Sequence, residues 1–270
     1  MTATELKRIA SKIRINILNL IYKTKSSHIG SCFCIVDILA VLYFKIMNIN
    51  PQNIKDENRD IFILSKGHAV VALYIVLAEA GFYDFSVLDK YATDGSKLAG
   101  HVIKNSLPGI EVSSGSLGHG LSMAVGMALA AKLDNKSRKI FCLMGDGECN
   151  EGSVWEATMF AAQHKLSNLY IIVDYNNQQG MGEADKIISQ NNLAERFRSF
   201  GCNSIDVDGH DIGALLGAFG GKVDTRPVVI AAKTIKGKGV SFMENNVDFH
   251  YKSPTDEQHA LALKELTESV

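Results

Sequence analysis

Two polar residues that could bind a cation stand thirty positions apart, each close behind an apolar run. Asp146 follows IFCLM in the segment GDGECNEG, and Asn176 follows LYIIVD in the segment YNNQQ. A βαβ unit has about this length, so the two runs are expected to be neighbouring parallel strands whose ends meet at one sheet edge. Carboxylate and amide oxygens suit Mg²⁺, which takes its remaining ligands from phosphates and water. The pair therefore predicts a site that holds a diphosphate through a divalent cation.

Nucleotide-binding motifs do not explain the same loop. The segment GDGECN departs from the dinucleotide fingerprint G-x-G-x-x-G because Asn150 stands at the third glycine. A P-loop is also excluded, since GGK at 220–222 is followed by Val223. Asp146 or Asn176 alone is more simply a turn or capping residue, as Asp and Asn often are. The pair at this spacing favours the metal.

The elements that position these residues alternate between short β-rich runs and helical patterns. Continuous apolar strands such as IFCLM are expected where helices cover both faces of a parallel sheet. The predicted fold class is α/β, a doubly wound, mostly parallel sheet with helices on both faces. The expected strands are 60–64, 139–143, 169–174, 204–207 and 228–232, and the expected helices are 31–47, 69–80, 118–133, 153–164, 193–200 and 211–219.

Both chain ends are expected to add helices to this sheet. Segment 1–22 has apolar residues at helical spacing and scattered Lys and Arg, which predicts an amphipathic helix and no signal peptide. From Lys236 a Gly- and Asn-rich stretch leads to a short helix from Thr255. We expect residues 1–235 to bind the diphosphate and metal, and residues 236–270 to be an arm and short helix of the same domain. No apolar stretch is expected to reach the length of a membrane span.

Composition excludes several classes of function. With 28 basic and 29 acidic residues the net charge is −1, so neither a nucleic-acid nor an anionic-membrane partner is indicated. The hydrophobic share of 46% and the charged share of 21% are typical of a soluble globular protein and exclude a disordered chain. Five cysteines without a CxxC pair are expected to be reduced thiols in a cytoplasmic protein.

The GDG segment, followed about thirty residues later by NN, resembles the fingerprint of thiamine diphosphate (ThDP) proteins. The wider sequence resembles the transketolase family in the order and approximate spacing of its motifs, over nearly the whole chain. In length the chain is similar to the amino-terminal, diphosphate-binding (PP-type) subunit of a split transketolase, whose second subunit carries the pyrimidine-binding and carboxyl-terminal domains. The matching segments are SHIG, LSKGHA, GH, GSLGHGLS, GDGECNEGSVWEA, VDYNNQQ, KTIKGKGVSFMEN and FH.

The resemblance implies a set of cofactor-binding residues. Asp146 and Asn176 would bind Mg²⁺ or Ca²⁺ through their side chains, and the backbone carbonyl of Gln178 would be a third ligand. Gly145 and Gly147 would lie against the diphosphate, with Gly147 donating its amide. The same cofactor would also contact His68, His250, Gly115 and Leu117.

The resemblance also implies which residues face the sugar. His28, His101 and His250 match the histidines around the reacting carbons, and Glu151 matches a carboxylate near the dimer interface and the partner's activating glutamate. Histidine suits the movement of protons on and off sugar hydroxyls because its pKa lies near neutrality. The chain reads SSHIG where the family often reads SGHPG, so the sugar stays open. Surface positions are expected for His164 and His259, and capping or packing roles for His119 and His210.

Three functions remain open from the sequence. The leading one is transfer of a two-carbon ketol unit from a ketose phosphate to an aldose phosphate through ThDP, with a partner chain in an α2β2 assembly. The alpha subunit of a 2-oxo-acid dehydrogenase would share the metal fingerprint but not the histidine set. A non-catalytic, partner-binding subunit would have no reason to keep Asp146, Glu151 and Asn176. A pentose phosphate is the default substrate, and a specialised sugar pathway stays open.

Overall fold

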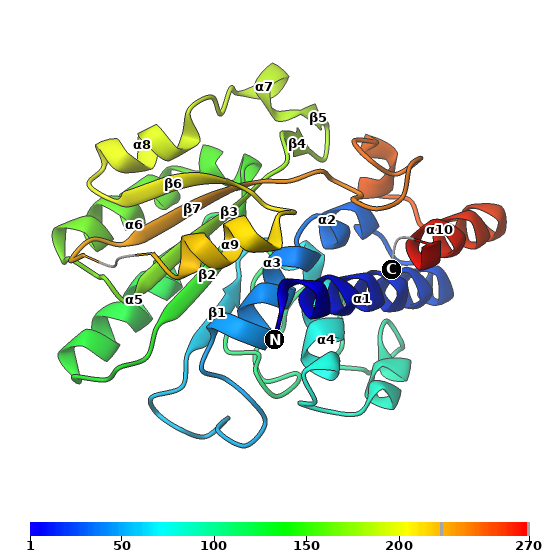
Figure 1. Ribbon diagram of the computed structural model, residues 1–270, viewed down its shortest axis with the longest axis horizontal. Coiled ribbons are helices and arrows are strands. Elements are labelled where there is room, and N and C mark those ends of the chain that lie inside the picture. Colours follow the sequence, from blue (N-terminus) through cyan, green and yellow to red (C-terminus); the bar gives the residue numbers. More distant parts are fainter. Residues whose placement is uncertain (222–223, 269–270) are drawn as a thin grey trace.

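A five-stranded parallel sheet forms the centre of the computed structural model, which describes residues 1–221 and 224–268. The strands lie in the order β1-β2-β3-β7-β6 (Figure 1), and each pairs in parallel with its neighbours. The predicted α/β class and the five predicted strands are confirmed. The bounds are β1 Ile61–Leu64, β2 Ile140–Gly145, β3 Leu169–Tyr175, β6 Asn203–Asp208 and β7 Val228–Lys233.

Helices cover both faces of this sheet because successive strand residues point to opposite sides. Phe141 and Leu143 join one buried cluster, together with α1, α3, α4 and α9. Ile140 and Cys142 join a second cluster, together with α5, α6 and α8. The bounds are α1 Ala3–Thr24, α3 Val36–Val41, α4 Val70–Glu79, α5 His119–Leu133, α6 Gly152–Gln163, α8 Leu193–Ser199 and α9 Ile212–Phe219.

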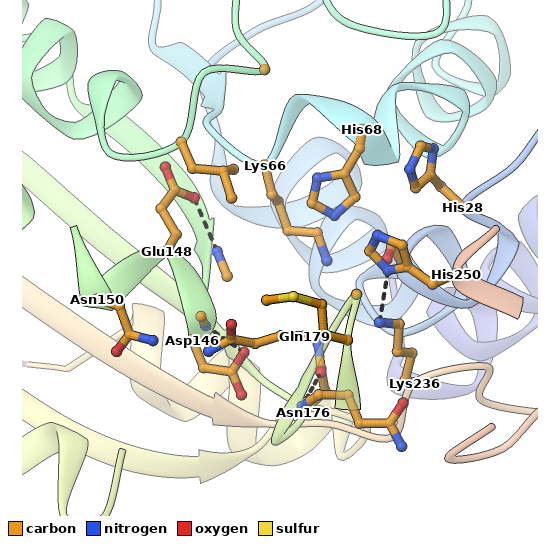
Figure 2. Close-up of a pocket in the computed structure, with 18 of the residues that line it drawn as sticks. His28, Lys66, His68, Asp146, Glu148, Asn150, Asn176, Gln179, Lys236 and His250 are labelled. Atoms are coloured by element: carbon orange, nitrogen blue, oxygen red, sulfur yellow. Dashed lines mark hydrogen bonds between the residues drawn. The ribbon is translucent and has the colours of Figure 1, made fainter. Parts of the chain in front are cut away.

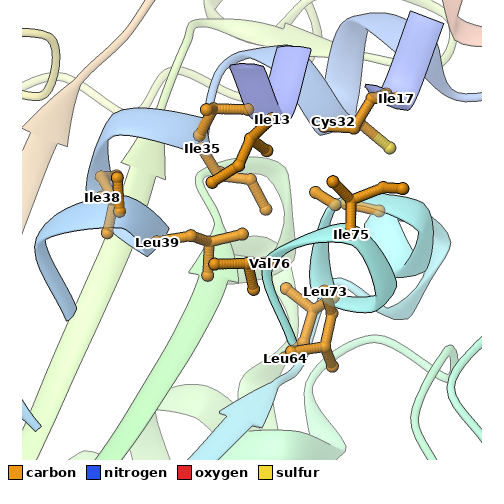
Figure 3. Packing of buried hydrophobic residues seen from close by; sticks show 14 of the residues in the cluster. Ile13, Ile17, Cys32, Ile35, Ile38, Leu39, Leu64, Leu73, Ile75 and Val76 are labelled. Atoms are coloured by element: carbon orange, nitrogen blue, oxygen red, sulfur yellow. The ribbon is translucent and has the colours of Figure 1, made fainter. Parts of the chain in front are cut away.

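The first cluster anchors the amino-terminal helices against the sheet. Figure 3 shows Leu73 of α4 beside Leu64 of β1 and Ile13 of α1 beside Ile35, and all four side chains are buried. Helix α1 begins with a capping box in which Thr2 and Glu5 bond to each other's backbone amides. This packing fixes the positions at which the loops after α1 and β1 begin.

The prediction of one continuous helix over 31–47 is wrong. The segment forms α2 Ile29–Phe33, α3 and a π-helical turn at Leu42–Ile46, with a break after Phe33. Two buried polar contacts lie at this break: the Cys34 thiol donates to Asp174, and Asp37 pairs with Arg14. Apolar periodicity does not reveal such contacts, because the residues between them are uniformly apolar.

The expectation that no stretch could span a membrane also needs correction. Among the described residues, 29–46 is long and apolar enough to cross a membrane by length and composition. In the structure, 83% of this segment is buried inside the protein. The same composition is found in the core helices of globular proteins, and this segment packs as one.

Further short elements surround the carboxyl edge of the sheet. A hairpin and a helical turn, which the sequence did not predict, follow β3. The arm from Lys236 returns to this edge through a 3₁₀ turn at Val247–His250, and α10 then packs on α1. Lys222, Val223 and the last two residues of the expected arm lie outside the described residues. The bounds are β4 Gln178–Gln179, β5 Gly182–Glu183, α7 Ala184–Ile187 and α10 Asp256–Glu268.

Candidate active site

The prediction that Asp146 and Asn176 follow two neighbouring parallel strands is confirmed. Strands β2 and β3 pair in parallel, with Gly145 opposite Asp174. Asp146 directly follows β2 and Asn176 directly follows β3, so both side chains stand at the carboxyl edge. Ligands of open parallel sheets bind at this edge.

All the residues that the sequence assigned to the site line one cavity of about 480 Å³. Figure 2 shows His28, His68 and His250 grouped on one side of it, apart from Asp146 and Asn176. The loops after β1, β2 and β3, the segment before α5 and the carboxyl-terminal arm all contribute. The predicted residues found there are His28, His68, His101, Gly115, Leu117, Gly145, Asp146, Gly147, Glu151, Asn176, Gln178 and His250.

Asp146 is a buried carboxylate without a positively charged partner among the described residues. It is 1% exposed, and its oxygens accept hydrogen bonds from the backbone amides of Gly147 at 2.7 Å and Asn177 at 2.6 Å. Burial, followed by the nearby charge of Asp174, raises the pKa of Asp146 to about 7. No salt bridge to Asp146 exists among the described residues. A divalent cation would remove the cost of this buried charge, which fits the predicted metal site.

The remaining candidate ligands are neutral oxygens. Asn176 is buried, and Gln178, whose backbone carbonyl is the third predicted ligand, lines the same cavity. The Gln178 side-chain oxygen is also buried, and it has no hydrogen-bond partner in the described part of the chain. Within residues 1–221 and 224–268 no group of three His, Cys, Asp or Glu side chains could hold a metal. A site with one carboxylate leaves several positions for phosphate and water oxygens. That donor set fits Mg²⁺ better than a transition metal.

Four histidines form a cluster beside this candidate metal site. The ring centroid of His28 lies 5.2 Å from that of His68, 6.0 Å from that of His101 and 5.0 Å from that of His250. Burial, followed by the neighbouring positive charges, lowers the pKa of His28 to about 4 and that of His250 to about 3. Burial lowers the pKa of His68 well below its ordinary value. These three rings are therefore neutral at pH 7.

The backbone of His28 is held in an unusual conformation. Its φ is 71°, in the left-handed region that few residues other than glycine adopt. The His28 amide donates to the carbonyl of His250 at 3.0 Å, and the ring Nδ1 lies 2.9 Å from the Ser27 hydroxyl. Such strain is stored where the surrounding structure imposes a position, most often at functional sites.

Lys236 is a cavity residue that sequence reasoning did not single out. It is 1% exposed, and its Nζ lies 2.9 Å from Nδ1 of His250 (Figure 2). Burial lowers the pKa of Lys236 to about 8, so the amine is mostly protonated at pH 7 and can only donate. His250 Nδ1 must then accept, which places the ring proton on Nε2. The motif KTIKGKG contained the signal, but a lysine there also fits a surface arm.

Glu148 is a second residue that the sequence analysis missed. It is buried, and one of its oxygens accepts from the Ser65 hydroxyl and from the Gly118 amide at 2.9 Å. The other oxygen accepts from the Gly145 amide at 3.2 Å. Glu148 therefore joins the loops after β1 and β2 to the start of α5. Its place directly after GDG was the available signal.

Glycine at position 115 permits a close approach to His101. Its φ is 143°, and an added Cβ would lie 2.7 Å from the His101 ring. The GSLGHG segment can therefore hold this histidine against the cavity wall. Its turn leads directly into α5.

The histidines without a predicted site role lie elsewhere. His119 and His164 are exposed, and His164 stacks on Phe160. His210 packs in a polar contact, where Nδ1 lies 2.7 Å from Asp37 and Nε2 accepts from the amide of Ile235. The surface position expected for His164 and the packing role expected for His210 agree with the structure.

The capping or packing role expected for His119 is wrong, because its side chain is exposed and Gly118 is the N-cap of α5. His259, which was expected at the surface, is half-buried and stacks on Tyr22.

Fold and geometry together define a class: an open parallel α/β protein with a candidate diphosphate and cation site beside neutral histidines. Residues 5–267 match the family described as the thiamine diphosphate binding domain of transketolase. The chain therefore belongs to the transketolase family.

Curated relatives agree with this assignment. The chain is 39% identical over 272 residues to an apulose-4-phosphate transketolase subunit of Phocaeicola vulgatus, covering 100% of this chain and 96% of the relative. It is 38% identical over 264 residues to the 6-deoxy-6-sulfo-D-fructose transketolase subunit of a Clostridium species, covering 97% and 96%. Both names favour transketolase over the dehydrogenase alternative.

Solved structures give the same fold. The transketolase of Campylobacter jejuni superposes with a TM-score of 0.92 at 31% identity, covering 99% of this chain and 43% of that chain. The doubly wound, ThDP-binding fold is thus confirmed. The chain spans less than half the length of that transketolase.

Proposed function

We propose that the chain is the amino-terminal subunit of a split transketolase, which transfers a two-carbon ketol unit from a ketose phosphate to an aldose phosphate. The observation that carries this proposal is the single cavity in which the candidate cation ligands and four histidines meet. Relatives of similar length that are named as transketolase subunits support it. The chain would work only with a second polypeptide.

The cation end of the cavity would hold the cofactor. When bound, ThDP supplies a nucleophilic ring carbon and an electron sink for the two-carbon unit. Asp146, Asn176 and the Gln178 carbonyl would hold Mg²⁺, with Ca²⁺ as the other candidate. Gly145 and Gly147 would lie against the diphosphate. The Gly147 amide, which donates to Asp146 Oδ1 here, would exchange this acceptor for a diphosphate oxygen once the cation binds Asp146. Further contacts to the cofactor would come from His68, His250, Gly115 and Leu117.

The histidine end of the cavity would face the sugar. His28 is neutral at pH 7, so it can accept a proton from a sugar hydroxyl without first losing one. His250 is also neutral, but its acceptor nitrogen Nδ1 is occupied by Lys236, so it would donate to a sugar oxygen from Nε2. His101 would complete the set of groups around the reacting carbons.

The open side of the cavity supports a need for a partner. Met181, which is 81% exposed, and Tyr251, which is 63% exposed, both line it. A second subunit would cover these side chains and exclude water from the sugar. In the family, that second chain also supplies the glutamate that activates the aminopyrimidine. Glu151 is exposed at the same cavity and would face this partner.

The sugar is the least defined part of the proposal. The relatives are named for apulose 4-phosphate and for 6-deoxy-6-sulfo-D-fructose, which are ketoses with an anionic group. These names support a specialised ketose beside the default pentose phosphate. A panel of both donor types, run with several aldose phosphate acceptors, would distinguish them.

Reconstitution tests the proposed function. The chain alone, with ThDP, Mg²⁺ and a ketose phosphate, should give no ketol transfer, and adding the candidate second subunit should restore turnover. Full turnover by the single chain would mean that the activating carboxylate lies in this chain. No turnover from the pair with any ketose of the panel would contradict the transketolase assignment.

We further propose an α2β2 heterotetramer in the cytoplasm. Five free cysteines, all of them buried, support a reducing compartment. Fractionation of cells that express the chain would test the location.

A further inference from the structure

A buried ion pair lies behind the candidate metal site. Asp174 Oδ2 lies 2.6 Å from Lys66 Nζ, and the two side chains are 0% and 2% exposed. Neither residue is a predicted cation ligand. Buried ion pairs stabilise a fold no better than apolar side chains of similar volume. Stability alone therefore does not explain why this ion pair lies behind the candidate metal site.

Asp174 contacts the one amide ligand of the candidate site. Its Oδ2 accepts from Asn176 Nδ2 at 2.7 Å. A carboxylate can only accept, so the nitrogen end of the Asn176 amide has to face Asp174. The oxygen end then points away, where it accepts from the backbone amide of Gln178 at 2.9 Å. An amide oxygen has two lone pairs, so one remains for a cation.

The partners of Asp174 explain why it is not itself a ligand. Oδ2 is shared by Lys66, Asn176 and the Cys34 thiol, and Oδ1 accepts from the Thr234 hydroxyl. Both oxygens are thus occupied by protein donors. Lys66 also supplies the charge that allows a second carboxylate to lie close to Asp146.

Strand geometry places Asp174 for this role. It lies in β3 two residues before Asn176, and residues two apart in an extended segment point to the same side. Lys66 follows β1 and reaches Asp174 from two strands away. Lys66 after β1, Cys34 between α2 and α3 and Thr234 after β7 all hold Asp174, which in turn fixes the Asn176 amide.

We propose that Asp174, neutralised by Lys66, is a positioning residue that keeps the Asn176 amide oxygen turned toward the divalent cation. This inference rests on the proposed ThDP function. Without an acceptor at position 174 the amide can rotate by half a turn and present its NH₂ group to the cation. An NH₂ group cannot bind a metal ion in this way, and its hydrogens repel the positive charge.

Two double variants that differ only at position 174 test the proposal. Lys66→Met/Asp174→Asn and Lys66→Met/Asp174→Leu both remove the ion pair, so neither leaves an unpaired buried charge. The asparagine variant keeps a carbonyl oxygen that can accept from Asn176 Nδ2, whereas the leucine variant has no acceptor. Both lack Lys66, so any effect of that lysine on the cofactor cancels in the comparison.

The readout is Mn²⁺ binding to the full chain in the presence of ThDP, followed by electron paramagnetic resonance. We expect Mn²⁺ to bind at least tenfold more weakly to the leucine variant than to the asparagine variant. Adding Asn176→Ala to both should abolish the difference, because Asp174 acts through Asn176. Equal affinities, or a tenfold difference that survives Asn176→Ala, would overturn the inference. Absence of Mn²⁺ binding by the unsubstituted chain would instead overturn the proposed function, and this inference with it.

A second measurement needs no variant. The Asn176 Nδ2 protons should exchange with solvent at least tenfold more slowly than those of the exposed Asn191, as followed by nuclear magnetic resonance. Equally fast exchange would show that the Asn176 amide is not held by Asp174. This measurement keeps the proposal open to refutation if the leucine variant does not fold.

Discussion

Asp146 is the only carboxylate among the three candidate cation ligands. Asp146→Asn removes that charge, so Mg²⁺-dependent binding of ThDP should weaken by at least tenfold, which corresponds to about 1.4 kcal/mol. Calorimetric titration with and without Mg²⁺ measures the effect. The exposed Asp206 provides a control, since Asp206→Asn should leave affinity unchanged. Unchanged, metal-dependent affinity in Asp146→Asn would contradict the ligand assignment.

His101 lies at the histidine end of the cavity, packed against Gly115. In the complex with the partner subunit, His101→Ala should lower kcat/KM for the sugar by about 100-fold, the scale of one acid–base group. Affinity for ThDP should change far less. His164→Ala is the matched control, because His164 is exposed and does not line the cavity. An effect confined to cofactor affinity would move His101 out of the sugar site.

The low pKa of His28 links stability to pH. Between pH 6.5 and about 4 the unfolded chain binds a proton at His28, while the folded chain does not. Protonation therefore stabilises the unfolded state as pH falls. The free energy of unfolding should decrease by up to about 1.4 kcal/mol per pH unit in this window because of His28. Urea unfolding from pH 6.5 to 4.5 measures the slope.

His28→Asn provides the comparison for this slope. Asparagine tolerates the left-handed backbone at this position and does not titrate. Its unfolding free energy should fall less steeply with decreasing pH than that of the unsubstituted chain. Parallel slopes for the two proteins would show that His28 is not held neutral.

At the scale of residues, the sequence identifies site residues that lie in a recognisable motif. It does not identify site residues whose role depends on their being buried. Asp146 and Asn176 were predicted from their spacing and residue types. Lys66 and Lys236 were not, because a lysine in a sequence reads as exposed, and only the fold reveals that both are buried. Glu148 was missed for the same reason.

At the scale of elements, strands were easier to predict than helix boundaries. Each strand is a short apolar run between polar loops, and the parallel sheet buries both of its faces. The segment 31–47 is apolar apart from Ser31, Asp37 and Lys45, so its pattern could not show the break between α2 and α3. Strands β4 and β5 have two residues each, which is too short for a periodic signal.

The start of α5 depends on close packing against the loop after β1. An added Cβ at Gly120 would lie 2.8 Å from Ser65 Cα, which is backbone and cannot move aside easily. Gly120→Ala should therefore lower the free energy of unfolding by about 1–3 kcal/mol and weaken ThDP binding. Urea unfolding and calorimetry measure the two effects.

Gly126 is the matched control on the same helix. Apart from the backbone of α5 itself, no described atom lies within 4 Å of an added Cβ there, so Gly126→Ala should stabilise the helix by about 0.5–1 kcal/mol. Cofactor affinity should not change. Loss of stability in both variants would mean that helix α5, rather than the contact with Ser65, sets the effect.

At the scale of the whole molecule, the sequence is sufficient to predict the fold. It is not sufficient to predict whether this chain alone encloses the cavity. Alternating strands and helices are sufficient to predict a doubly wound sheet and the edge at which ligands bind. They do not reveal that Met181 and Tyr251 leave the cavity open to solvent, because exposure depends on how the hairpin and the arm pack. A partner was predicted only through the resemblance to split transketolases.

The assembly of the two chains is the last prediction. If each cavity is closed by a partner chain, and the complex has the closed two-fold symmetry common among oligomers, two copies of each chain should assemble. Sedimentation of the mixed chains should give the mass of an α2β2 complex, and activity should rise in proportion to its population. The contribution of Glu151 can be tested in the same experiment, since Glu151→Gln should lower activity in the complex without changing Mg²⁺ affinity of the single chain. A fully active complex with one copy of each chain would refute the symmetric arrangement, because one closed cavity would then be sufficient for turnover.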